Sequence, residues 1–395
     1  MIKHSQYFTE FKYAKSMISL LSSLKVERIL DLGIGNASLS LAALQLWPNA
    51  HVDSIDIDEK ICRNVPLLHS NIHVIHGDAI TASINTLFLP NSYDLAVCNP
   101  PYGIVSKEMN FQKLFLHANL QECTELKRLS ADVIFIAKNI LCLKESGVLC
   151  AILPDGLLTR KDLLPFRKAL LLHHEVWGIY QLPEKSFSKT EARTHIVLLK
   201  KNGKTSEDVT VGIINNDGQV DETILVKSEE LFDRMDFSYL KWKSVSGYKQ
   251  QQMTVLYERI IIKRGSCTYN FLHSKKKIFL HSNSFKDGDI LDFMASYVDQ
   301  TDNKVYAEKG DVVMCRVGKR SVGKVAYIKS GRVLISDCLY KISLPSVDGR
   351  KLFEQLLDEK TKDWIRHSSH GVCAKVISKA DLLGYLSKYV DFDCW

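Results

Sequence analysis

The chain has 395 residues, which exceeds the usual size of one hydrophobic core and predicts two domains. Hydrophobic residues make up 46% and charged residues 25%, as in ordinary globular proteins. We find no signal-peptide-like N-terminus and no apolar run near the ~18 residues of a membrane helix, so we expect a cytoplasmic protein with no membrane partner. The ten cysteines form no CxxC pair, which argues against a metal site and a disulfide framework.

The net charge of +7 is unevenly distributed along the chain. Residues 1–241 contain 26 Lys+Arg and 28 Asp+Glu, whereas residues 242–395 contain 26 and 17. A near-neutral part joined to a basic C-terminal part is typical of a catalytic domain that carries a polyanion-binding module. Many basic surfaces bind nothing, so charge alone does not settle the matter.

Short β-rich runs alternate with helical patterns through residues 1–200. Most of these runs are apolar on both faces, which suits buried strands of a mainly parallel sheet. We expect strands at Glu27–Asp31, His51–Ile57, Ile72–His76, Tyr93–Asn99, Gly147–Pro154, Glu175–Leu182 and His195–Lys200. We expect helices at Ser38–Leu46, Ala131–Leu143 and Leu163–Leu172. The alternation predicts a doubly wound, Rossmann-like α/β domain with a seven-stranded sheet.

The helix–strand rhythm weakens after the polar stretch Lys201–Asp208. Residues 248–263 have the pattern of a connecting helix. Short strands separated by glycine-containing turns are expected beyond it, at Val312–Arg316, Lys324–Ile328 and Val333–Ile335. We therefore predict domains at 1–245 and 246–395, the second being a smaller mixed α+β domain.

Three consecutive strands of the first domain are each followed by residues suited to a cofactor. Asp31 ends the first strand, and Gly33 and Gly35 then allow a sharp turn and a close approach to a ligand. Asp56 ends the next strand, where a carboxylate can accept hydrogen bonds from a ribose diol. Asp78 follows the third strand and can accept from an adenine amine. The alternative is three solvated loop acids.

The glycine turn does not complete a dinucleotide-binding fingerprint. Position 38, where the third glycine would stand, is serine. This argues against a cofactor whose pyrophosphate must rest on the helix N-terminus. A cofactor with adenosine and a charged amino-acid tail, but no phosphate, fits better.

The fourth strand ends in Asn99-Pro100-Pro101-Tyr102. Consecutive prolines stop the strand and hold the following carbonyls rigidly. The side-chain oxygen of Asn99 and a proline carbonyl can then accept both N–H groups of one planar amine, and the Tyr102 ring can stack on a flat base. Catalysis would come from positioning and preorganised acceptors. The alternative is a turn that merely ends a strand.

Residues 6–200 resemble the catalytic core of the gamma-class adenine-N6 DNA methyltransferases, and especially the methylation subunits of type I restriction-modification systems. The matching motifs are Gln6-Tyr7-Phe8-Thr9, Asp31-Leu32-Gly33-Ile34-Gly35, Asp56, Gly77-Asp78, Asn99-Pro100-Pro101-Tyr102, Leu143-Lys144-Glu145-Ser146-Gly147, Ile152-Leu153-Pro154-Asp155-Gly156 and Leu182-Pro183-x-x-x-Phe187. One departure is Glu10, which follows Thr9 where the family usually has proline.

The resemblance implies S-adenosyl-L-methionine as cofactor and an adenine flipped out of duplex DNA as substrate. The implied cofactor-binding residues are Phe8, Thr9, Asp31, Gly33, Gly35, Asp56, Ile57, Asp78, Ala79 and Asn99. The implied catalytic residues are Asn99, Pro100, Pro101 and Tyr102. Tyr102 and Phe187 are the implied base-stacking residues, although Phe187 fits a core side chain at a strand edge equally well. No metal is implied.

Residues 309–326 resemble one target-recognition half of a type I specificity subunit. The basic residues that we predict to bind DNA are Lys275, Lys276, Arg316, Lys319, Arg320 and Lys324. A solvated charged face remains the commoner explanation for a lysine triple such as 275–277.

Together these features predict a site-specific DNA adenine-N6 methyltransferase of a restriction-modification or related system. Its expected partners are double-stranded DNA and a nuclease or specificity subunit, although recognition and catalysis on one chain would allow it to act alone. The same turn can hold any planar amine or amide. An RNA adenine, a protein glutamine and cytosine N4 therefore remain alternative acceptors, and a DNA-binding module without chemistry is a further alternative.

Overall fold

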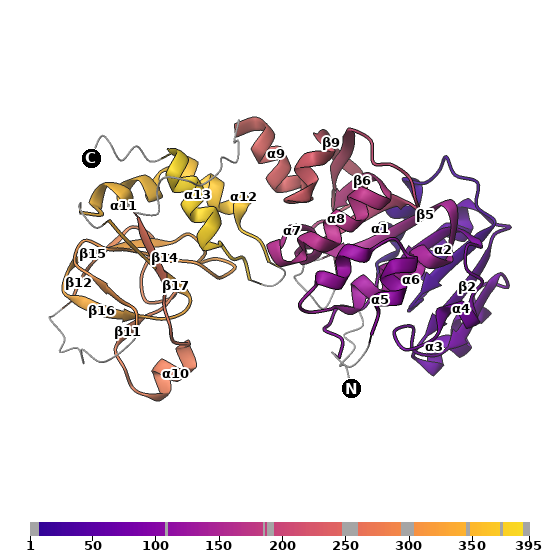
Figure 1. Cartoon of the computed structure of the whole chain (residues 1–395), viewed down its shortest axis with the longest axis horizontal. Helices are drawn as coiled ribbons and strands as arrows, with labels where there is room; N and C mark the ends of the chain where they lie inside the picture. The colour runs from indigo at the N-terminus through magenta and orange to yellow at the C-terminus, as the bar shows by residue number, and fades with distance from the viewer. Residues whose placement is uncertain are drawn as a thin grey trace. The chain divides into compact units, whose positions relative to one another are not determined.

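The computed structural model describes residues 8–106, 110–184, 186–187, 193–246, 260–293, 304–344, 348–371 and 374–389. The chain forms two compact units, residues 1–241 and 242–395, coloured indigo to rose and rose to yellow in Figure 1. The division falls inside α9 (Phe237–Ser246), slightly before the predicted boundary at 245/246. Each unit has its own hydrophobic core.

The N-terminal unit is built on a nine-stranded sheet with the order β3-β2-β1-β4-β5-β7-β6-β8-β9. Its strands are β1 (Arg28–Leu32), β2 (His51–Asp56), β3 (Ile72–His76), β4 (Tyr93–Cys98), β5 (Leu143–Pro154), β6 (Glu175–Gln181), β7 (Thr194–Lys200), β8 (Asp208–Ile214) and β9 (Val220–Lys227). The five strands β1 to β5 pair only in parallel with one another, whereas β7 is antiparallel to both of its neighbours.

Helices cover this sheet. They are α1 (Phe11–Ser19), α2 (Ser38–Leu46), α3 (Glu59–Asn64), α4 (Ile84–Leu87), α5 (Gln112–His117), α6 (Ala131–Cys142), α7 (Asp155–Thr159) and α8 (Leu164–His173), with 3-10 turns at Val65–Leu67, Gln121–Glu125, Lys161–Leu163 and Ser228–Phe232. In α6, eleven of the twelve residues are buried, because this helix is apolar on nearly every side. A helix of this kind must lie in the interior.

The predicted α/β fold is confirmed, with one difference in the size of the sheet. All seven predicted strands form; six start within one residue of their predicted starts, and β5 starts earlier, at Leu143. The sheet has nine strands rather than seven because β8 and β9 extend it beyond β6. β9 alternates exposed and partly buried positions, which is the pattern of an outer strand.

The strand order reverses direction at β1. From β1 the chain proceeds to β2 and β3 on one side, and then returns to β4 and β5 on the other. Ligands of open α/β sheets bind at such a switch point, outside the carboxyl ends of the strands. The glycine turn after β1 and the Asn-Pro-Pro-Tyr turn after β4 lie at this edge.

The C-terminal unit contains two small sheets with the orders β10-β17-β14-β15-β12 and β11-β16-β13. Its strands are β10 (Ile261–Arg264), β11 (Phe279–Leu280), β12 (Asp289–Asp292), β13 (Tyr306–Glu308), β14 (Val312–Cys315), β15 (Val325–Ser330), β16 (Arg332–Ile335) and β17 (Leu339–Ser343). Its helices are α10 (Tyr269–Ser274), α11 (Arg350–Leu357), α12 (Glu359–Ser368) and α13 (Lys379–Tyr389).

The helix predicted over residues 248–263 is wrong at its C-terminal end. Residues 261–264 form β10, which pairs antiparallel with β17, and residues 248–259 lie outside the described part of the chain. The β-branched run Ile260-Ile261-Ile262 favours a strand once a partner edge is present. Among the described residues, no helix combines the length and the apolarity needed to cross a bilayer.

Candidate active site

A pocket of about 710 Å³ of empty space, its open mouth included, lies at the carboxyl ends of the central strands of the N-terminal unit. The residues that line it are Phe8, Gly33, Gly35, Ile55, Asp56, Ile57, Gly77, Asp78, Ala79, Ile80, Asn99, Pro100, Pro101 and Phe135. They lie at the end of β2 or follow β1, β2, β3 and β4, apart from Phe8 near the N-terminus and Phe135 on α6. The switch point therefore holds a cavity.

The glycine turn after β1 forms the floor of this pocket. Gly33 and Gly35 have φ values of +78° and +53°, in the left-handed region that other residues rarely adopt. A Cβ on Gly33 would stand 3.3 Å from the Phe135 ring, and one on Gly35 would stand 3.2 Å from the Phe8 ring. The two glycines thus leave a cradle that larger residues would narrow.

Two carboxylates form the polar wall. The backbone N–H groups of Gly35 and Asp58 each donate to a different carboxylate oxygen of Asp56 at 2.9 Å. The N–H of Ile80 donates to Oδ1 of Asp78 at 2.8 Å. These bonds fix both acids at the ends of β2 and β3.

The pocket is negative in character. The described residues that line it include two acids and no lysine or arginine. A wall of this kind attracts a cationic ligand and repels a phosphate group.

Asp31 is buried near Asp56, outside the pocket lining. Its side chain is 2% exposed and is absent from the pocket lining, although the sequence suggested a cofactor contact. Burial raises the pKa of Asp31 to about 7, against the opposing hydrogen bond from the Ser40 hydroxyl, and Asp56 raises it further. The Ser40 hydroxyl donates to Oδ2 of Asp31 at 2.6 Å.

The Asn99 side chain is held from two directions. Its Nδ2 donates to the Thr9 hydroxyl at 3.1 Å, and its Oδ1 accepts from the Tyr102 hydroxyl at 3.1 Å. The turn is further anchored to the start of α6, because the N–H of Ala131 donates to the carbonyl of Gly103 at 2.8 Å. The amide is thus presented in a fixed orientation at the pocket.

The sequence model of the N-6 DNA Methylase family matches residues 2–258, which is more than half of the chain. The chain belongs to this family. The match covers the whole nine-stranded sheet and the pocket, and it ends before β10.

This N-6 DNA methylase is similar to curated proteins of restriction-modification systems. It is 25% identical over 197 residues to the type I restriction enzyme MpnII methylase subunit of Mycoplasma pneumoniae, covering 45% of this chain and 36% of that protein. It is 27% identical over 233 residues to the type II methyltransferase M.HincII of Haemophilus influenzae, covering 58% and 42%. The chain therefore spans less than half the length of either relative.

The type IIG restriction endonuclease BpuSI shares the fold with a TM-score of 0.52 and 13% sequence identity, over 95% of this chain and 58% of that chain. At this identity the likeness concerns the fold alone. It is notable that the likeness extends beyond the family match into the C-terminal unit.

The structure brings together most of the residues that the sequence singled out in this N-6 DNA methylase. Of the ten predicted cofactor-binding residues, all but Thr9 and Asp31 line the pocket. Thr9 is 4% exposed and holds Asn99 instead. Gln6 and Tyr7, which carry part of the N-terminal motif, lie outside the described residues.

Phe187 lies in the hydrophobic core. Its side chain is 2% exposed and packs in a cluster that includes Leu182 and Ile196. Stacking on a base would require this side chain to leave the core, so the stacking role of Phe187 stays a prediction.

Four pocket residues were given no site role from the sequence: Ile55, Gly77, Ile80 and Phe135, although Gly77 belongs to the matching Gly77-Asp78 motif. Ile55 and Ile80 are neighbours of predicted residues along the chain, so a wider window around each strand end would have found them. Phe135 lies inside an almost wholly apolar helix, and nothing in the local sequence distinguishes it from the other core residues.

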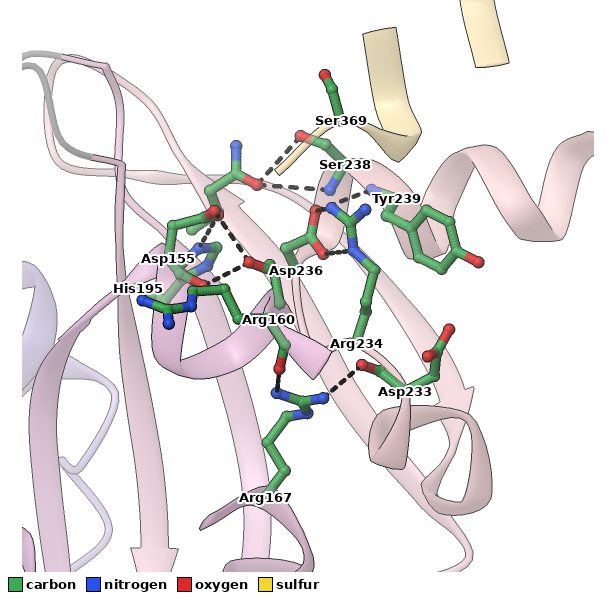
Figure 2. A network of polar contacts seen from close by, with 12 residues as sticks. Asp155, Arg160, Arg167, His195, Asp233, Arg234, Asp236, Ser238, Tyr239 and Ser369 are labelled. Atoms are coloured by element: carbon green, nitrogen blue, oxygen red, sulfur yellow. Dashed lines mark hydrogen bonds and ion pairs between the residues drawn. The ribbon is translucent and has the colours of Figure 1, made fainter. Parts of the chain in front are cut away.

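Directly after β5, the same methylase buries a network of polar side chains around Asp155, shown in Figure 2. Nε2 of His195 lies 3.1 Å from Oδ1 of Asp155, and the Thr159 hydroxyl donates to Oδ2 of Asp155 at 3.2 Å. Burial raises the pKa of Asp155, but the hydrogen bond and charge of His195 and the charges of Arg193 and Arg234 outweigh it and lower the pKa to about 2.

The described residues offer no partner to Nδ1 of His195, which is fully buried. The neighbouring Arg234 forms a bidentate pair with Asp236, with bonds of 2.7 and 2.8 Å. The network thus pairs its buried charges within itself.

The predicted DNA-binding residues of the C-terminal unit differ in exposure. Lys275, Lys276, Lys319 and Arg320 are exposed, whereas Arg316 and Lys324 are partly buried. The guanidinium of Arg316 donates to the Asp337 carbonyl at 3.2 Å and lies over the Tyr340 ring.

Lys276 adopts a φ of +50° at the end of α10, a position where glycine is the favoured residue. Residues 260–286, which include α10, contain six Lys and Arg and no Asp or Glu. The exposed tip around α10 is therefore strongly basic.

Proposed function

We propose that this chain is a site-specific DNA methyltransferase that transfers the methyl group of S-adenosyl-L-methionine to the N6 amine of an adenine. The observation that carries the proposal is that Asn99 and Pro100 line the same pocket as Asp56 and Asp78. An amine acceptor site and a site suited to an adenosine cofactor thus adjoin each other at one sheet edge. Membership of the N-6 DNA methylase family supports this reaction.

The pocket residues fit this cofactor. Asp56 ends β2, where it can accept from a ribose diol, and Asp78 can accept from an adenine amine. The cradle left by Gly33 and Gly35 admits the amino-acid tail without a Cβ in the way. The acidic lining suits a molecule that carries a sulfonium and an ammonium charge but no phosphate.

The cofactor would supply an electrophilic methyl group, so that the N6–CH3 bond forms as the S–CH3 bond breaks, S-adenosyl-L-homocysteine leaves and one N6 proton passes to solvent. The protein positions the acceptor. The Asn99 side-chain oxygen and the Pro100 carbonyl accept the two N–H groups of the adenine amine, which directs the nitrogen lone pair toward the methyl group. The Tyr102 hydroxyl and Thr9 hold the Asn99 amide for this task. The described residues place no strong base in the pocket lining, so preorganised acceptors carry the catalysis.

Double-stranded DNA is the proposed substrate because the second unit offers a basic surface. The exposed residues Lys275, Lys276, Lys319 and Arg320 are suited to phosphate contacts, and the target adenine must leave the duplex to reach Asn99. We propose that residues 242–395 form the target-recognition domain.

The proposal also concerns which partner subunits this chain needs. One relative is named as a methylase subunit of a type I restriction enzyme. Since the chain carries a basic second unit of its own, we propose that it methylates DNA without a separate specificity subunit and that any nuclease acts as a separate partner.

The test is a transfer assay with radiolabelled S-adenosyl-L-methionine on duplex DNA, RNA and a protein extract, followed by digestion of the product to nucleosides. We expect label in DNA as N6-methyladenine. Asn99→Ala removes one of the two acceptors and should lower kcat by at least about 10²-fold, with duplex affinity nearly unchanged. Tyr102→Phe keeps the ring but loses the hydroxyl that bonds Oδ1 of Asn99, so it should lower kcat by less than Asn99→Ala does.

Full activity of the Asn99→Ala variant would refute the catalytic assignment. Label found only in RNA, in protein or in N4-methylcytosine would replace the proposed acceptor with the one observed.

A further inference from the structure

Lys138 is a buried lysine on α6 whose ammonium group faces three backbone carbonyls. Its Nζ donates to the carbonyls of Ala79, Ile80 and Ala82 at 2.6, 2.8 and 2.9 Å. The residue is 5% exposed. An ammonium group has three donors, so this one segment of chain, residues 79–82, uses them all.

The same segment is a wall of the pocket. Asp78, Ala79 and Ile80 line the cavity, and the carboxylate of Asp78 accepts from the N–H of Ile80. One turn before Lys138 on α6, Phe135 lines the pocket beside Gly33. The helix therefore contacts the ligand site with one side chain and clamps its wall with another.

A second lysine shows what a purely structural role looks like. Lys201 is also 5% exposed, and its Nζ donates to Oδ1 of Asn91 at 2.6 Å and to the carbonyl of Leu143 at 2.7 Å. Burial lowers the pKa of both lysines, that of Lys138 to about 8. Neither Asn91 nor Leu143 lines the pocket. Lys138 and Lys201 therefore both lose hydration on burial, but only Lys138 bonds residues of the pocket wall.

We propose that Lys138 is a positioning residue that fixes the segment after β3 so that Asp78 meets the adenine ring of the methyl donor. This inference rests on the proposed function only for the identity of the ligand. The lysine acts through the backbone, because its three hydrogen bonds end on carbonyl oxygens of the wall segment and its own side chain does not line the pocket.

The test compares Lys138→Met with Lys201→Met in the full chain. Both variants should unfold at a lower temperature than the wild type, because both lose a buried hydrogen-bonded group. We expect only Lys138→Met to weaken binding of S-adenosylhomocysteine, by about tenfold in calorimetry, an effect equal to the loss of one charge-assisted bond.

The adenine ring gives a second readout. In S-inosylhomocysteine an oxygen replaces the amine, so the wild type should bind it more weakly than S-adenosylhomocysteine through repulsion from Asp78. Lys138→Met should narrow this difference, and in the transfer assay it should raise KM for the methyl donor more than it lowers kcat. Lys138→Gln, whose amide keeps two N–H donors, should recover part of the affinity and serves as well if the methionine variant fails to fold.

Wild-type affinity in the Lys138→Met and Lys138→Gln variants, or an equal loss in Lys201→Met, would overturn the positioning role while leaving the proposed function intact. A wild type that binds neither analogue would overturn the proposed cofactor and this inference together.

Discussion

Two buried acids of the N-terminal unit, Asp31 at the end of β1 and Asp155 directly after β5, face opposite electrostatic conditions. Both are 2% exposed. The pKa of Asp31 is raised to about 7 by burial, with one hydroxyl as its polar partner in the opposing direction. The pKa of Asp155 is lowered to about 2, because His195 and two nearby arginines outweigh the same burial penalty. The two carboxylates are equally buried, so their neighbours decide whether the pKa is raised or lowered.

The difference matches the positions of the two residues. Asp155 lies in a network that pairs buried charges, where an anion is needed. Asp31 lies close enough to Asp56 for their charges to repel, and a neutral Asp31 spares the pocket a further negative charge. The supporting acid beneath the pocket thus has a pKa raised to about 7.

The largest effect is expected for Asp155→Ala. Removing this carboxylate leaves the buried His195 ring without its carboxylate partner and should lower the free energy of unfolding by about 3–5 kcal/mol at pH 7. Because the folded pKa is depressed, this stabilisation is present above pH ~4 and is lost as the pH falls through about 2. Urea titrations at several pH values measure it.

The control for that variant is Asp162→Ala. Asp162 pairs with Arg160, but the two side chains are 61% and 49% exposed. Its removal should change the free energy of unfolding by at most about 1 kcal/mol. Similar losses in both variants would show that Asp155 contributes no more than a surface acid.

A smaller effect of opposite sign is expected for Asp31→Asn. A raised folded pKa gives stability that is present below pH ~4 and is lost as the pH rises through about 7. The asparagine variant does not lose it, so its stability relative to the wild type should grow between pH 4 and pH 8. A shift of about three units sets an upper bound of roughly 4 kcal/mol on this gain. A difference that does not vary with pH would contradict the assignment.

The smallest effect is expected for Ser40→Ala. Without the Ser40 hydroxyl, the Asp31 carboxylate loses the bond that favours its charged form, and the pKa of Asp31 should rise further. The pH at which the wild type loses this stability should move to a higher value, and the free energy of unfolding above pH 8 should fall by roughly 1–2 kcal/mol. Ser38→Ala, in the same helix and also buried, is the matched control and should leave the pH dependence unchanged.

The strands of the first unit were predictable because they are short, apolar on both faces and separated by turn residues. Their ends then located the site, since Gly33, Asp56, Asp78 and Asn99 each follow a strand in one parallel sheet. β9 was not predictable, because a half-exposed outer strand has the polarity of a loop. The strand β10 was mistaken for helix because its partner, β17, is distant in sequence.

The supporting residues of the site escaped prediction for a similar reason. Phe135 and Lys138 reach the pocket and its wall only because α6 packs against the ends of β1 and β3 in three dimensions. The one available signal was Lys138 itself, a lysine in the middle of an apolar helix, whose buried charge had to find acceptors. Likewise, no local pattern showed that Arg316 bonds to Asp337.

Because the strand order reverses at β1, the two halves of the pocket are formed by strands on opposite sides of β1. The ends of β1, β2 and β3 and the loops after them form the half suited to the methyl donor, and the loop after β4 forms the half suited to the acceptor. A substitution in the loops of one half therefore need not disturb the other half, because the other half is held by different strands. A methylase built this way can acquire a new target amine by changing a single connection, without rebuilding the groups that hold its donor.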